Sequence, residues 1–270
     1  MRTIVHLSDL HFGRVDPALL DPLVAAVAAA RPDVVAVSGD LTQRARNAQF
    51  IAARQFLDRL PTPRIVVPGN HDIPLYDVFR RFAAPLRRFR RHITGESAPF
   101  FRDGEVAIVG INTARSLTFK NGRINADQVA NVNECFSGLD PAVARVVVTH
   151  HPFDLPSHRK ESDLVGRATM AMRAFAEARV DLFLSGHLHQ SHASSTAMRY
   201  RIEGHSALVV QAGTASSTRG RGESNSFNVI RIGRPDITVE VHRWDAATGA
   251  FAQAGASVYR RDDSGWSLAP

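Results

Sequence analysis

Short apolar runs alternate with longer amphipathic stretches along the first 190 residues of the chain. Segments 3–9, 34–40, 64–72, 106–114, 145–152 and 181–189 each contain a run of apolar, largely β-branched residues that is followed by polar ones. Runs of this length predict strands that are buried on both faces. Segments 16–33 and 47–60 have helical spacing, with Arg31-Pro32 ending the first and Asn47 as the expected N-cap of the second. The alternation indicates an α/β fold.

Beyond residue 195 the pattern changes to β-rich segments at 207–216, 226–233 and 237–244. No long helix separates them, so we expect these C-terminal strands to be antiparallel. The stretch WDAATGAF predicts a hairpin turn at Thr248-Gly249. We expect residues 1–270 to form a single domain, with the motif-bearing part at about 1–232 and a C-terminal β-hairpin at about 236–262.

Composition is that of an ordinary globular protein, with 44% hydrophobic and 22% charged residues. No apolar run reaches the roughly 18 residues of a spanning helix. The N-terminus does not resemble a signal peptide, and the one cysteine, Cys135, excludes an internal disulfide. These features predict a cytoplasmic protein without a membrane span. The net charge of +7 comes almost entirely from arginine. It favours anionic partners, or else reflects a codon bias.

Side chains that can bind metal ions follow five of the predicted strands. They are Asp9, His11, Asp40, Asn70, His71, Asp72, His150, His151, His187 and His189. Because parallel strands end at one edge of a sheet, we expect these groups to meet there. Imidazole and carboxylate donors without a nearby thiolate suit Mn, Fe, Zn or Co. Two such ions about 3.5–4 Å apart bind both oxygens of a phosphoryl displacement and supply a hydroxide nucleophile at neutral pH.

Together, Asp9-x-His11, Gly39-Asp40, Gly69-Asn70-His71-Asp72, His150 and Gly186-His187-x-His189 resemble the calcineurin-like metallophosphoesterase family over roughly residues 3–190. The resemblance implies a four-layer α/β/β/α sandwich. It implies one metal ion held by Asp9, His11, Asp40 and His189. It implies a second ion held by Asp40, Asn70, His150 and His187, with Asp40 as the bridge.

The resemblance also implies that His71 lies over the phosphate as electrophile or general acid, oriented by Asp72. The role of His151 stays open between substrate contact and packing. The segment LTQRARN lacks the tyrosine that binds metal in purple acid phosphatases. The sequence at residues 69–72 is GNHD, whereas protein phosphatases have GNHE. Two motifs, SDLHFG and SGDLT, are similar to the corresponding motifs of small bacterial class III cyclic-nucleotide and glycerophosphodiester phosphodiesterases.

That similarity implies a dinuclear-metal-dependent phosphodiesterase in which a metal-bound hydroxide attacks a small anionic phosphodiester. A 3′,5′-cyclic nucleotide is the expected substrate, and a glycerophosphodiester or another phosphoester is the alternative. A different class, an arginine-rich nucleotide- or nucleic-acid-binding protein with vestigial activity, is less favoured. No aromatic RNA-binding signature accompanies the arginines. The metal pair and the oligomeric state stay open.

Two arginine-rich segments allow more than one interpretation. Six arginines lie between Arg80 and Arg91, interleaved with phenylalanines at helix-like spacing around Pro85. We expect a solvated basic face with its phenylalanines in the core; the alternatives are a rim that guides anionic substrates and an interfacial helix on an acidic membrane. The loop from Arg219 to Asn225, with Arg221 and Ser224, is either an exposed loop or a contact for phosphate or ribose.

Overall fold

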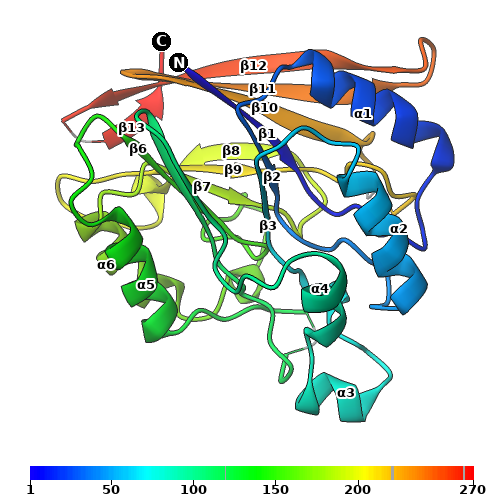
Figure 1. Ribbon diagram of the computed structural model, residues 1–270. Coiled ribbons are helices and arrows are strands. Elements are labelled where there is room, and N and C mark those ends of the chain that lie inside the picture. Colours follow the sequence, from blue (N-terminus) through cyan, green and yellow to red (C-terminus); the bar gives the residue numbers. More distant parts are fainter. Residues whose placement is uncertain (119, 220–221, 264) are drawn as a thin grey trace.

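Two β-sheets pack face to face at the centre of the molecule (Figure 1). The computed structural model describes residues 1–118, 120–219, 222–263 and 265–270. The seven-stranded sheet has the order β13-β12-β11-β10-β1-β2-β3, and the six-stranded sheet has the order β4-β5-β6-β7-β9-β8.

Ten of the described strands coincide with segments that the sequence predicts as strands, whereas β4, β8 and β13 were not predicted. In chain order they are β1 (Arg2–Leu7), β2 (Val34–Val37), β3 (Arg64–Val66), β4 (Phe100–Arg102), β5 (Val106–Gly110), β6 (Ala144–Val148), β7 (Leu182–Ser185), β8 (His192–Ser195), β9 (Leu208–Gln211), β10 (Ser226–Gly233), β11 (Asp236–Asp245), β12 (Ala250–Asp262) and β13 (Gly265–Leu268).

Helices cover the outer face of each sheet. The α-helices are α1 (Leu20–Ala29), α2 (Asn47–Leu57), α3 (Val78–Ala83), α4 (Arg87–His92), α5 (Ala126–Phe136) and α6 (Ala168–Glu177). The 3₁₀-helices are η1 (Pro17–Leu19), η2 (Asn70–Asp72), η3 (Glu161–Asp163) and η4 (Thr196–Met198). Figure 1 shows α1 and α2 on one side of the sandwich and α5 and α6 on the other. The predicted α/β/β/α architecture is confirmed.

Three apolar cores separate the four layers. Side chains alternate between the two faces of a strand, so Val5 of β1 packs toward α1 and α2 while Ile4 packs toward the second sheet. On β5, Ile108 belongs to the central core and Val109 to the core beneath α5 and α6. Because both faces are covered, these strands are almost wholly apolar.

Some expectations need correction. β10 to β13 are antiparallel as expected, but β9 pairs parallel to β7. Residues 186–207 carry β8 and η4 instead of a long helix, and this connection is long enough for a parallel crossover. The N-cap of α2 is Arg46, one residue before Asn47.

In the arginine-rich segment Phe89 is buried, whereas Phe79 is 81% and Phe82 is 55% exposed. Of these three phenylalanines, only Phe89 therefore lies in the core.

A buried carboxylate joins the ends of the two sheets. Asp181, just before β7, is 1% exposed and accepts hydrogen bonds from Arg234 Nη2 at 2.6 Å and Arg261 Nη1 at 2.6 Å. The Trp266 indole Nε1 of β13 donates to it at 3.1 Å. Asp181 therefore fixes the C-terminal strands of the first sheet against the second.

We predict that Asp181→Ala lowers the free energy of unfolding by about 3 kcal/mol, because it leaves guanidinium and indole donors without their buried acceptor. Urea unfolding followed by circular dichroism measures this. Asp21→Ala, which removes an exposed partner of Arg59, is the matched control and costs less than about 1 kcal/mol. Equal midpoints for the two variants would contradict the proposed role.

Candidate metal centre

The loops after β1, β2, β3, β6 and β7 converge at one edge of the sandwich. They bring together all seven predicted metal ligands: Asp9, His11, Asp40, Asn70, His150, His187 and His189. This convergence follows from parallel pairing, since β1, β2 and β3 are mutually parallel, as are β5, β6, β7 and β9.

One group of donors surrounds Asp9. Its Oδ1 lies 3.4 Å from His11 Nε2 and 3.4 Å from His189 Nε2. The backbone N–H of His187 and the Ser8 hydroxyl donate to the other oxygen, Oδ2, at 3.0 and 2.7 Å. The Asp9 carboxylate is thus held by two fixed donors and presents its Oδ1 toward the imidazoles.

A second group surrounds Asn70. Its Oδ1 lies 3.1 Å from His150 Nε2 and 3.1 Å from His187 Nδ1. Asp40 Oδ2 lies between the two groups, 3.4 Å from His150 Nε2 and 3.8 Å from His11 Nε2. Asp40 Oδ2 therefore borders both groups.

The donor atoms fit bound metal ions. Two ligand atoms each about 2.1 Å from an ion, at a tetrahedral angle, lie about 3.4 Å apart. The observed separations of 3.1–3.8 Å match this value. Asp9 Oδ1 and His11 Nε2 are buried and have no hydrogen-bond partner among the described residues. Buried polar atoms seldom stay unpaired, so these two are suited to coordination.

The backbone around these donors is strained. Nine residues other than glycine have positive φ in the described part of the chain, and five of them are predicted ligands: Asp9, His11, Asp40, His187 and His189. Side-chain-bearing residues rarely adopt this left-handed conformation, and such residues cluster at functional sites. The strain supports a functional constraint at each of the loops that follow β1, β2 and β7.

Glycines allow the loops to approach one another. A Cβ at Gly186 would lie 1.8 Å from Ser8 Oγ, and one at Gly69 would lie 2.1 Å from Asp40 Oδ1. Gly186 therefore lets the chain before His187 pass directly against the Asp9 loop. This explains why a glycine precedes the two histidines.

Nearby imidazoles keep the buried carboxylates of Asp9 and Asp40 charged. Burial alone would raise the pKa of Asp40, but the adjacent His150 outweighs burial and holds that pKa well below its usual value. Burial alone would lower the pKa of His150, whereas the adjacent Asp40 raises it to about 9. His150 Nδ1 donates to the Ser38 carbonyl at 2.8 Å, which directs Nε2 toward Asp40 and Asn70.

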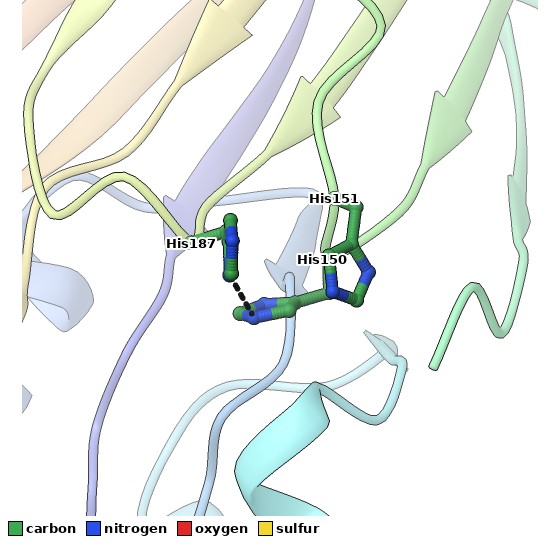
Figure 2. Close-up of side chains that lie close together, drawn as sticks. All are labelled: His150, His151 and His187. Atoms are coloured by element: carbon green, nitrogen blue, oxygen red, sulfur yellow. Dashed lines mark hydrogen bonds between the residues drawn. The ribbon is translucent and has the colours of Figure 1, made fainter. Parts of the chain in front are cut away.

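His151 has a different environment from His150, although the two are adjacent (Figure 2). Its Nε2 donates to the Lys120 carbonyl at 2.9 Å, and its Nδ1 accepts from the Thr113 hydroxyl at 2.8 Å. Burial lowers the pKa of His151 to about 3, so the ring is neutral. Both nitrogens are engaged by the protein, and this favours His150 as the ligand.

His71 lies at the rim of the site, half-buried, with its ring centroid 4.9 Å from that of His11. Its Nδ1 donates to the Gln43 carbonyl at 2.9 Å, and its Nε2 accepts from Arg219 Nη1 at 2.9 Å. Burial lowers the pKa of His71 below its ordinary value. The ring is therefore neutral at pH 7, with Nε2 as its acceptor.

The expectation that Asp72 orients His71 needs correction. Among the described residues, no hydrogen bond joins the Asp72 carboxylate to the His71 ring. Its carboxylate accepts from the backbone N–H groups of Leu41, Thr42 and Gly69 at 2.9–3.1 Å. It thus ties the loop after β2 to the loop after β3. Burial and the nearby Asp40 raise the pKa of Asp72 to about 6.

Two arginines extend the site beyond the predicted set. Arg44 Nη1 lies 3.4 Å from His71 Nδ1, and sequence reasoning did not single it out. Its position in the segment LTQRARN, directly after the Gly39-Asp40 motif, is the sequence feature that could have indicated a place near the site. Arg219 was predicted only as one option for its loop, and it lies beside His71. Asn225 donates to backbone carbonyls, while Arg221 lies outside the described residues.

None of the described helices combines the length and the apolar character needed to cross a bilayer.

The family model for calcineurin-like phosphoesterases matches residues 2–191. A 42-residue stretch is 48% identical to the glycerophosphodiester phosphodiesterase GpdQ of Enterobacter lignolyticus, covering 16% of this chain and 15% of that protein. The fold is similar to purple acid phosphatase PPD1 from yellow lupin, with a TM-score of 0.68 and 12% identity over 97% of this chain and 54% of that one. It is also similar to a dimetal phosphatase from Danio rerio, with a TM-score of 0.60 and 14% identity over 89% and 95% of the two chains.

The family match covers more than half of the chain and all the loops that carry the clustered donors. It agrees with the family that the sequence motifs indicate. The chain therefore belongs to the calcineurin-like phosphoesterase family.

Proposed function

We propose that the protein is a phosphodiesterase that depends on two divalent metal ions. The observation that carries this proposal is the position of Asp40, whose Oδ2 lies between two groups of nitrogen and oxygen donors. Asp9, His11, Asp40 and His189 would hold one ion. Asp40, Asn70, His150 and His187 would hold the other. A binding protein with vestigial activity has no need for two complete buried groups of ligands.

Bound ions of this type lower the pKa of a water molecule and neutralise charge on phosphate oxygens. The chain's own residues bind and orient the ester. His71 and Arg219 lie side by side at the rim, and the Arg219 guanidinium points at His71 Nε2. A phosphate oxygen that enters between them would accept from the guanidinium. A His71 ring protonated at Nε2 would donate that proton to the alkoxide oxygen that leaves as the P–O bond breaks, and the ring would return to its neutral form.

The substrate class is the finer part of the proposal. A 3′,5′-cyclic nucleotide is the first choice, because the motifs SDLHFG and SGDLT are similar to those of small bacterial class III phosphodiesterases. A glycerophosphodiester has a separate observation in its favour, the 48% identity of one short stretch to a glycerophosphodiester phosphodiesterase. Both are small anionic phosphodiesters. The native ions would be Mn, Fe, Zn or Co, because the donors are nitrogen and oxygen.

We predict that chelated protein has no turnover and regains it when Mn, Zn, Co or Fe is added, with a phosphodiester hydrolysed faster than its monoester. Bis(p-nitrophenyl) phosphate and p-nitrophenyl phosphate give the comparison by absorbance. Cyclic nucleotides and glycerophosphodiesters are then tested by phosphate-coupled assays. Preference for the monoester, or no turnover with any of the four metals, would contradict the proposal.

We predict that His71→Ala lowers kcat by about 10²–10⁴-fold while the metal content stays that of the wild type, because His71 acts on the ester and not on the ions. Metal analysis and kinetics on the same preparation separate the two effects. His158→Ala, at an exposed histidine, is the control and leaves both unchanged. Loss of metal from His71→Ala would show that His71 is a ligand instead.

A further inference from the structure

An unusual apolar surface surrounds α3. Five of the twelve exposed large apolar side chains in the described structure gather on this segment and on the loop beside it. We call them the apolar tip: Tyr76, Val78, Phe79, Phe82 and Leu117, with exposed fractions of 76%, 62%, 81%, 55% and 84%. Figure 1 shows α3 projecting at one end of the molecule, away from the sheets. Exposed apolar groups that cluster in this way mark interaction sites.

The tip is a braced structure. Arg81 is 2% exposed, and its guanidinium donates to three backbone carbonyls: Ser116 at 2.7 Å, Thr118 at 2.7 Å and Pro74 at 3.0 Å. These bonds fix α3 against the loop that carries Leu117. The buried Arg81 therefore holds the exposed apolar side chains of the tip in fixed positions.

The surface next to the tip is strongly basic. Residues 73–95 contain six arginines and one acid, Asp77. A cavity of about 410 Å³ between α3 and α4 is lined by Phe79 of the tip and by Arg80, Arg87, Arg88 and Arg91. Arg80 pairs with Asp77. Arg87 and Arg91 have no hydrogen-bond or ion-pair partner among the described residues.

We propose that the apolar tip and the adjacent arginines dock the protein on the surface of an anionic phospholipid membrane. The apolar side chains would enter the boundary between headgroups and acyl chains, and the arginines would bind lipid phosphates. A second copy of this chain fits less well. Pairing two tips about a two-fold axis would bring two sets of unpaired arginines together.

Docking in this way would turn the metal centre toward the membrane. The Arg44 guanidinium lies 5.9 Å from the Tyr76 ring centroid, and Arg44 also contacts His71. The tip therefore borders the rim of the site. Membrane binding does not depend on the proposed activity, and it is measured on chelated protein without turnover.

The test is co-sedimentation of the full chain with vesicles of phosphatidylcholine alone and with about one third phosphatidylglycerol. We expect binding to the anionic vesicles only, weakening as salt is added. The triple variant Phe79→Ser, Phe82→Ser, Leu117→Ser should bind at least about tenfold more weakly. Arg87→Gln and Arg91→Gln should each cost about fivefold. Met198→Ser, at a side chain that is 90% exposed on η4, is the matched control.

Circular dichroism of every variant separates misfolding from lost docking, and hydrolysis of a soluble diester by the triple variant should equal that of the wild type. No binding to anionic vesicles at low salt would overturn the proposal. So would concentration-dependent dimerisation, seen by light scattering, that the triple variant abolishes. Inhibition of vesicle binding by inorganic phosphate at an ionic strength matched with chloride would assign the cavity to a free anion and would also overturn it.

Discussion

Asp40 is the charged group on which the geometry of the site depends. Its carboxylate is 1% exposed and accepts the backbone N–H of His71 at 2.8 Å. It lies where the loop after β2 of the first sheet meets His150, which follows β6 of the second sheet. A buried carboxylate is stable only when positive or hydrogen-bonding groups surround it. The loops from both sheets must therefore close around Asp40, and the surrounding cores allow them to do so.

The sequence predicts the layers and the ligand loops because both depend on short-range patterns. Apolar runs without alternation indicate strands buried on both faces, and polar residues after each run mark the same sheet edge. The direction of β9 was not predictable in this way, because the crossover between β7 and β9 contains no long helix. β8, with the sequence HASS, has no apolar pattern at all.

Contacts at the rim depend on side-chain directions that sequence spacing does not encode. Asp72 follows His71 directly, yet its carboxylate accepts from the backbone N–H groups of Leu41 and Thr42, whereas the imidazole contacts the Gln43 carbonyl and Arg219. Phe79 and Phe82 share helical spacing with Phe89, but only Phe89 faces the core. The break between α3 and α4 turns the two helices independently, so one continuous amphipathic pattern does not describe both. A family match gives the fold, whereas function has to be argued from the residues of the site itself.

The proposed dinuclear centre is tested most directly by the position and number of metal ions in a crystal soaked with Mn²⁺, read from anomalous scattering. We expect two ions per chain, about 3.5–4 Å apart, with Asp40 between them. His150 and His187 would lie at one ion, and His11 and His189 at the other. A single ion, or two ions with Asp40 bound to only one, would contradict the dinuclear centre.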